Sequence, residues 1–203
     1  MTLDRRQCVQ ALLAERGDLL VVSGLGAPTY DVAAAGDSPL NFYLWGAMGG
    51  AAMIGLGLAL ARPRARIAVI TGDGEMLMGL GSLATIGVKQ PQNLAILVLD
   101  NRRYGETGMQ ASHTQHGVDM IGVAKACRFA EARPISQESE FAAARHLLHA
   151  APGPVFIQAQ VRQEEVARVS RASEVEAGLR PSFPTLRRDP RTGDWRLHRT
   201  ENR

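Results

Sequence analysis

The stretch that decides the fold is Ile67-Ala68-Val69-Ile70-Thr71-Gly72-Asp73-Gly74-Glu75, matched downstream by Leu94-Ala95-Ile96-Leu97-Val98-Leu99-Asp100-Asn101. Both aliphatic runs are apolar throughout rather than alternating, a pattern typical of parallel strands buried on both faces. Residues 75–90, between the two runs, are enough for one helix. The sequence therefore predicts a strand–helix–strand unit, and open α/β sheets bind their ligands at the carboxyl ends of such strands.

Each predicted strand ends in a side chain that suits a hard cation. Asp73 offers an anionic oxygen, and Asn101, which lies 28 residues further on, offers a neutral amide oxygen. Magnesium usually takes one or two protein carboxylates together with substrate phosphate oxygens, and the glycines beside Asp73 allow a phosphate to approach the backbone closely. A lone Gly-Asp-Gly is more often only a turn, but its spacing to Asn101 favours a metal–diphosphate site.

The rest of the pattern predicts an α/β fold, with a single parallel-sheet domain that carries helices on both faces. Two further strands are expected at residues 19–22 and 154–160, and residues 27–42 are expected to form a connector. The Gly24 and Gly26 pair lacks the third glycine and the downstream acid of a dinucleotide-binding loop. The other helices are expected at residues 3–16, 47–60, 118–130 and 138–150.

Composition divides the 203 residues into two parts. Residues 1–161 carry 13 basic and 13 acidic side chains, whereas residues 162–203 carry 10 arginines against seven acids and form a basic C-terminal extension. The extension has no lysine cluster or nucleic-acid motif, so we expect a solvated or subunit-packing segment and no nucleic-acid partner. No apolar run is long enough to span a membrane, and the N-terminus has no signal-peptide core. With two cysteines at no metal-binding spacing, a cytoplasmic protein is expected.

A third motif makes a family resemblance plain. Leu44-Trp45-Gly46-Ala47-Met48-Gly49-Gly50 precedes a glycine-rich apolar stretch. Together with Gly-Asp-Gly-Glu and Leu-Asp-Asn-x-x-Tyr-Gly, it resembles the diphosphate-binding (PP) domain of thiamin-diphosphate enzymes of the pyruvate-decarboxylase-like superfamily. Within that superfamily the chain is most similar to the C-terminal halves and β subunits of phosphonopyruvate and sulfopyruvate decarboxylases. The resemblance covers residues 18–161, and it implies that residues 1–161 form the thiamin-diphosphate-binding domain.

The resemblance also implies roles for single residues. Mg²⁺ (or Ca²⁺) would be held by Asp73, the Asn101 side chain and the Arg103 carbonyl group. The Gly46 carbonyl would accept a hydrogen bond from the 4′-amino group of thiamin diphosphate, and Met48 would be the apolar wedge that bends the cofactor. Met48 as an ordinary core methionine is the alternative. The full set expected to bind the cofactor is Gly46, Met48, Gly72, Asp73, Gly74, Glu75, Asn101 and Tyr104, with the backbone N–H groups of Gly74 and Glu75 facing the diphosphate.

The loop at residues 104–117 follows the predicted metal site directly. In relatives, an acidic or polar residue near the position of Thr107 assists proton transfer, so Glu106 and Thr107 are candidate catalytic residues. His113 is a third candidate, because histidine titrates near neutrality, although a loop histidine is more often simply solvated. Arg102 and Arg103 are candidates to pair with a second acidic group on the substrate, and solvation at the surface is the equal alternative.

The function that this resemblance implies is a 2-oxoacid decarboxylase half that works with a second polypeptide. In the superfamily, a glutamate on a separate pyrimidine-binding domain activates the cofactor, and that domain has no counterpart here. We therefore expect an α/β hetero-oligomer with a pyrimidine-domain (α) subunit and a small 2-oxoacid substrate. The alternatives are an acetolactate-synthase-like carboligase half, a β subunit of a 2-oxoacid:ferredoxin oxidoreductase, and a non-catalytic phosphate-binding module.

Overall fold

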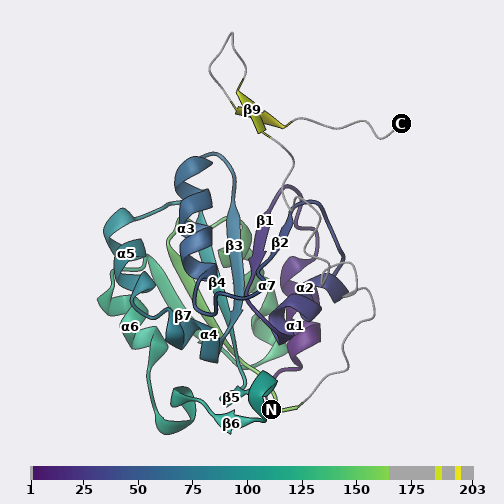
Figure 1. The fold of residues 1–203 in the computed structure, drawn as a ribbon, viewed down its shortest axis with the longest axis vertical. Coiled ribbons are helices and arrows are strands. Elements are labelled where there is room, and N and C mark those ends of the chain that lie inside the picture. Colours follow the sequence, from purple (N-terminus) through teal and green to yellow (C-terminus); the bar gives the residue numbers. More distant parts are fainter. Residues whose placement is uncertain (1, 165–185, 189–194, 198–203) are drawn as a thin grey trace.

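The fold is a parallel sheet enclosed by helices, seen in a computed structural model that describes residues 2–164, 186–188 and 195–197. Six strands pair in the order β2-β1-β3-β4-β8-β7, and every pairing is parallel (Figure 1). The sequence prediction of an α/β parallel sheet is therefore confirmed. The strands are β1 (Leu20–Ser23), β2 (Asn41–Tyr43), β3 (Ile67–Gly72), β4 (Leu94–Asp100), β7 (Glu131–Ile135) and β8 (Val155–Gln160).

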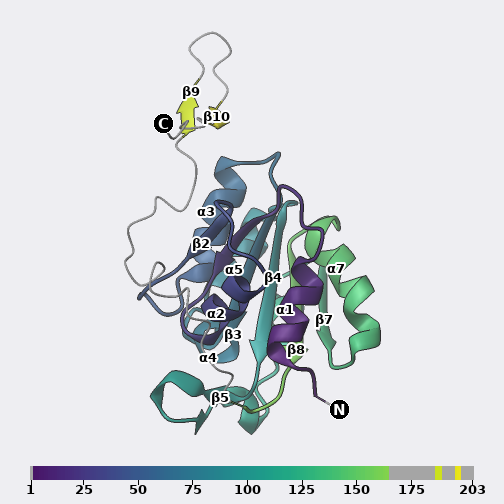
Figure 2. The ribbon, with the colours of Figure 1, turned by 90° about the vertical axis from the view of Figure 1, so that its right-hand side faces the viewer.

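Helices cover both faces of the sheet, as the sequence predicts (Figure 2). Successive residues of β4 point to opposite faces, so Ile96 joins one apolar core and Leu97 the other. The first core is closed by α3 (Ala51–Ala61), α4 (Asp73–Met78), α5 (Ser82–Lys89) and α6 (Met120–Ala126). The second core is closed by α1 (Arg5–Leu13), α2 (Ala27–Ala34) and α7 (Phe141–His149).

The single helix expected at residues 75–90 is wrong, because the structure has two helices there, α4 and α5. The break falls at Gly79, which packs directly against the backbone of Gly49. A Cβ atom at Gly79 would lie 2.2 Å from the carbonyl oxygen of Gly49. Only glycine fits at that distance, so Gly79, the C-cap of α4, allows the segment that contains Met48 to pack against the end of this helix.

The connector expected at residues 27–42 is also wrong, because this range contains α2 and the start of the short strand β2. Strand β7 was not expected either. It contains Pro134, which has no backbone N–H group to donate to a neighbouring strand. The proline is tolerated there because β7 is the outermost strand. The expected helix at residues 118–130 is shorter in the structure, because α6 begins after its N-cap Asp119, whose side chain accepts from the Gly122 N–H group at 2.9 Å.

The boundary expected between residues 161 and 162 follows directly after the last strand of the sheet. Val161 pairs in parallel with Leu3 beyond the end of β8. Most of the basic extension lies outside the described residues. Its described parts are residues 162–164 and the antiparallel pair β9 (Leu186–Arg188) and β10 (Trp195–Leu197). Among the described residues, no helix combines the length and the apolarity that a membrane crossing requires.

The connections leave β1 and β3 towards opposite faces of the sheet. The loop after β1 leads to α2, which packs on one core, while the turn after β3 leads to α4, which packs on the other. A crevice opens between strand ends where neighbouring connections diverge in this way, and it is the usual ligand site of open α/β sheets. The fold therefore predicts a site that the ends of β1, β3 and β4 share.

Candidate active site

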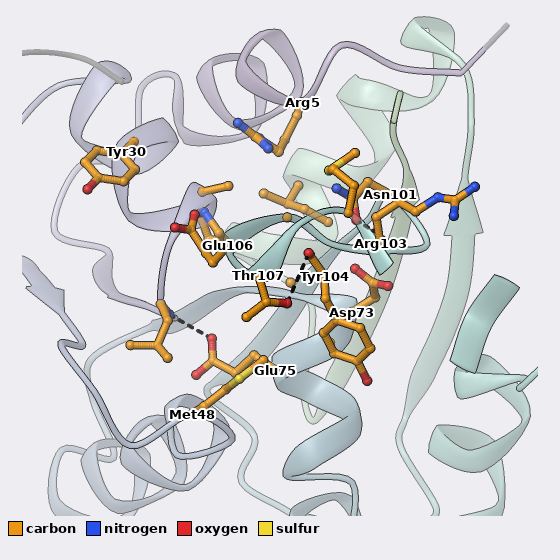
Figure 3. A pocket seen from close by; sticks show the side chains of 18 of the residues that line it. Arg5, Tyr30, Met48, Asp73, Glu75, Asn101, Arg103, Tyr104, Glu106 and Thr107 are labelled. Carbon is orange, nitrogen blue, oxygen red and sulfur yellow. Dashed lines mark hydrogen bonds between the residues drawn. The ribbon is translucent and has the colours of Figure 1, made fainter. Parts of the chain in front are cut away.

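A cavity of about 720 Å³ lies where these strand ends meet (Figure 3). Most of the residues singled out from sequence line it, although they come from three separate segments of the chain. These are Met48, Gly72, Asp73, Gly74, Glu75, Asn101, Arg103, Tyr104, Glu106 and Thr107. Gly46 and His113 are not among the lining residues. The structure therefore brings together the predicted metal ligands, most of the predicted cofactor contacts and two of the three candidate catalytic residues.

Asp73 is the buried acid at the centre of the site. It is the first residue of α4 and only 2% exposed. The Ser112 hydroxyl donates to its Oδ2 atom, and the Thr114 hydroxyl lies 3.3 Å from the same oxygen. Burial raises the pKa of Asp73, and the nearby Asp100 carboxylate raises it further, while the hydrogen bond from Ser112 opposes both. A cation bound here would relieve the cost of keeping this carboxylate charged.

A network of hydrogen bonds behind Asp73 was not expected from the sequence. Thr114 also donates to Asp100 at 2.9 Å, and the Gln158 amide donates to the other oxygen of Asp100 at 2.6 Å. Ser112 is fully buried and Asp100 is 3% exposed. The network fixes the loop after β6 (Gln110–Ala111) against the ends of β3 and β4. Ser112 and Thr114 flank His113 in a loop without periodicity, so no sequence signal separates them from solvated residues.

Asn101 and Arg103 form a tight turn at the end of β4. The Arg103 backbone N–H donates to the Asn101 side-chain oxygen at 2.9 Å, and the intervening Arg102 has a φ of 60°. The turn fixes the direction of the Asn101 oxygen, which keeps a second lone pair. In Figure 3 the guanidinium group of Arg103 runs away from the other lining side chains, and its Nε atom donates to Gln163 at 3.2 Å.

The Glu75 side chain is a structural link as well as part of the lining. It is 4% exposed, and its Oε2 atom accepts from the Leu25 N–H and the Thr71 hydroxyl, both at 2.9 Å. A Cβ atom at Gly24 would lie 1.7 Å from Oε2, so glycine is required there. Burial raises the pKa of Glu75, while these hydrogen bonds lower it. The carboxylate thus ties the loop after β1 to the turn after β3.

Tyr104 closes over the start of α4. A Cβ atom at Gly74 would lie 2.5 Å from the Tyr104 ring, and 3.6 Å from the terminal methyl of Met48. The Tyr104 hydroxyl lies 3.1 Å from Nδ1 of His113. His113 therefore reaches the cavity only through Tyr104. Met48 is 39% exposed, which disagrees with the alternative of an ordinary core methionine.

The donor set fits a magnesium ion that also binds a phosphate. Among the described residues there is no group of three or more His, Cys, Asp and Glu side chains arranged for a metal. One carboxylate, one amide oxygen and one nearby carbonyl, from Asp73, Asn101 and Arg103, are too few ligands for magnesium alone. They are enough when phosphate oxygens and water complete an octahedron.

Comparison with known proteins gives the class of this domain. Residues 25–159 match the family described as "Thiamine pyrophosphate enzyme, C-terminal TPP binding domain". The chain is also 38% identical over 162 residues to the sulfopyruvate decarboxylase subunit beta of Methanothermobacter thermautotrophicus, covering 80% of this chain and 84% of that protein. The chain belongs to this family of thiamine pyrophosphate-binding domains, which confirms the resemblance found in the sequence.

Two further similarities are to proteins longer than this chain. The chain is 35% identical over 190 residues to the phosphonopyruvate decarboxylase of Streptomyces viridochromogenes, covering 93% of this chain and 47% of that protein. It superimposes with a TM-score of 0.66 on a thiamine diphosphate-dependent 4-hydroxybenzoylformate decarboxylase from Rhodococcus jostii, at 19% identity, covering 81% of this chain and 34% of that one. The chain thus spans about half of the first of these proteins and a third of the second, and the second similarity concerns the fold alone.

Ser112→Ala tests whether the network orients Asp73. Without the Ser112 hydroxyl, the carboxylate is less well fixed, and loss of such a supporting contact typically weakens metal affinity by about 10- to 100-fold. We expect a fall of this size in Mg²⁺ affinity, measured by calorimetry in the presence of thiamin diphosphate. Ser82→Ala is the matched control, because the Ser82 hydroxyl is buried without a hydrogen-bond partner among the described residues. Equal Mg²⁺ affinity in the two variants would contradict the orienting role.

Proposed function

We propose that this chain is the diphosphate-binding subunit of a thiamin-diphosphate-dependent 2-oxoacid decarboxylase that acts on phosphonopyruvate, sulfopyruvate or a similar substrate. The observation that carries the proposal is the convergence of Asp73 and Asn101, at the ends of adjacent strands, on the cavity that the start of α4 also lines. The similarity to the two decarboxylases named above supports the substrate class, because these proteins are named for three-carbon 2-oxoacids with a second acidic group.

The residues of the cavity divide into an anchor and a reaction region. Asp73, Asn101 and the Arg103 carbonyl would hold Mg²⁺, and the backbone N–H groups of Gly74 and Glu75 would bind the diphosphate. When bound, thiamin diphosphate supplies a carbon nucleophile and then accepts the electrons released as carbon dioxide leaves. The protein groups position both partners and exclude water. Tyr104 would border the diphosphate site because its ring lies against Gly74. Gly72 would border it as the residue directly before α4.

The Met48 segment and the loop after β4 would face the reacting end of the cofactor. Met48 would wedge the cofactor into its bent form, and the Gly46 carbonyl would accept from its amino group. Gly46 lies on an exposed turn with a φ of 83°, outside the cavity lining, so this contact requires the cofactor to extend out of the cavity towards a partner. Glu106 and Thr107 remain candidates for proton transfer, and His113 would act through Tyr104.

An exposed apolar surface around the cavity supports the need for a partner. Trp45 is 67% exposed, and Met53 and Met78 are also exposed. Trp45 and Met53 flank the Met48 segment, and that segment packs on the chain directly after Met78. Exposed apolar patches of this kind commonly mark interaction sites. We propose that a pyrimidine-domain (α) subunit covers this surface and completes the cofactor site, so that the enzyme is an α/β hetero-oligomer. The similarity to proteins named as beta subunits supports this.

Product analysis of the reconstituted complex tests the proposed reaction. The chain, its candidate partner, thiamin diphosphate and Mg²⁺ are incubated with sulfopyruvate or phosphonopyruvate, and the products are identified by mass spectrometry. We expect one carbon dioxide and one aldehyde per substrate consumed. A product that joins two substrate-derived fragments would instead establish a carboligase, and cofactor binding without any turnover would establish a non-catalytic module.

A further inference from the structure

Arg5, on the first turn of α1, lines the same cavity from a different element than the cofactor anchor. Its side chain is only 11% exposed, and its Nε atom forms an ion pair with Asp31, whose side chain is fully buried. Asp31 belongs to α2, so the guanidinium group is fixed between two helices. In Figure 3, Arg5 lies on the opposite side of the cavity from Glu75 and Asp73.

Asp31 also contacts a second arginine. Arg6 also binds Asp31, with its Nε atom 3.3 Å from Oδ1, so two guanidinium groups share one carboxylate. Within the described ranges, neither terminal nitrogen of Arg5 donates to another residue. A shielded guanidinium with unused N–H groups suits an oxyanion, because its planar fork can form two parallel hydrogen bonds.

Arg102 and Arg103, proposed from sequence to bind a second acidic group of the substrate, are less suitable for this role than Arg5. Arg103 lines the cavity, but its guanidinium runs away from the other lining side chains in Figure 3 and binds Gln163. Arg102 is not among the lining residues. Arg5 is thus the cation of the cavity that is both fixed in position and shielded from solvent.

We propose that Arg5 binds an oxyanion inside the cavity, namely the second acidic group of the substrate. This assignment rests on the proposed function for the substrate itself. A sulfonate or phosphonate group and the terminal phosphate of the cofactor share the same chemistry. The substrate is favoured, because Asp73, the centre of the diphosphate anchor, lies on the other side of the cavity from Arg5 in Figure 3. Pyruvate, which has no second acidic group, gains nothing from this contact.

Arg5→Gln in the reconstituted complex tests the proposal. A charge-assisted hydrogen bond in a shielded site is worth a factor of about 10 to 100 in binding. We expect KM for sulfopyruvate and phosphonopyruvate to rise by that factor, with KM for pyruvate and Kd for thiamin diphosphate within about twofold of wild type. Arg6→Gln is the matched control, since Arg6 binds the same carboxylate but does not line the cavity.

The outcomes separate the two sources of the oxyanion. A rise in the Kd of thiamin diphosphate, with unchanged KM values, would assign Arg5 to the cofactor phosphate. An equal rise in KM for pyruvate, or no change in any constant, would overturn the proposal.

A second measurement does not depend on turnover, so it separates failure of this proposal from failure of the proposed function. The full chain, saturated with thiamin diphosphate and Mg²⁺, is titrated with phosphonoacetate or acetate while its thermal unfolding is followed. We expect phosphonoacetate, but not acetate, to raise the Tm of wild type and of Arg6→Gln. Arg5→Gln should lose that shift. Equal shifts in Arg5→Gln and wild type would refute the role of Arg5 even if the complex proved inactive.

Discussion

Purified alone, this chain is expected to release no carbon dioxide from pyruvate, sulfopyruvate or phosphonopyruvate, and addition of a pyrimidine-domain partner is expected to restore turnover. In the superfamily, the acid that activates the cofactor comes from the pyrimidine-binding domain. Glu75 is the other acid in this cavity that is as buried as Asp73, but its Oε2 atom is already engaged by Leu25 and Thr71. We therefore expect Glu75 to hold two loops together rather than to activate the cofactor. Steady-state carbon dioxide release, with and without the partner, measures the effect.

The control for this prediction is the partner assayed without this chain, which should also be inactive. A reconstituted complex that carries Glu75→Gln should keep measurable turnover, because the amide retains the size of the side chain and one acceptor oxygen. Robust turnover by this chain alone that Glu75→Gln abolishes would contradict the account, since it would identify Glu75 as the activating acid.

The second large effect is expected for Asp73→Asn, which should abolish Mg²⁺-dependent cofactor binding without unfolding the chain. The change removes the charge that neutralises the metal, while the amide oxygen can still accept from Ser112 and Thr114. Loss of binding is expected to exceed about 100-fold, as for removal of a charged group from a buried site. Calorimetric titration with thiamin diphosphate and Mg²⁺ measures it. Asp18→Asn, at an exposed position, is the control.

Although Asp73→Asn should lose cofactor binding, we expect it to stabilise the metal-free fold. The pKa of Asp73 is raised above its ordinary value of 3.8, so the folded state binds a proton at this carboxyl more tightly than the unfolded state does. The carboxylate therefore destabilises the metal-free fold increasingly as the pH rises from about 4 to about 6, the raised pKa, and by a constant amount above that. Asparagine does not ionise. In EDTA, we expect Asp73→Asn to gain in Tm relative to wild type between pH 4 and about pH 6, and to keep a constant gain from there to pH 8. A steady loss of Tm across this range would show that Asp73 is a stability residue.

The strand ends were predictable because their signal is local. The aliphatic runs before Asp73 and Asn101 are continuous, and adjacent parallel strands place their carboxyl ends at one edge. The diverging helices α2 and α4 then explain why the cavity opens there. The position of Met48 was predictable only from its motif, because no periodicity indicates that the turn before α3 packs against α4.

Other features were not predictable, because they depend on contacts between segments that are distant in sequence. The break between α4 and α5 coincides with the close approach of Gly79 to Gly49, 30 residues earlier. Ser112 and Thr114 gain their roles only when their loop folds back onto Asp73 and Asp100. Arg5 lies 68 residues before Asp73, on an amphipathic helix where an arginine is ordinarily solvated.

The most direct test of the central claim, that this chain supplies the metal and diphosphate half of a shared site, is calorimetric titration with thiamin diphosphate. It is performed on the chain alone and on the reconstituted complex, each in Mg²⁺ and in EDTA. The account predicts one cofactor per chain, bound only when Mg²⁺ is present, with higher affinity in the complex than in the chain alone. Absence of Mg²⁺-dependent binding in both samples, or binding that EDTA does not affect, would contradict it.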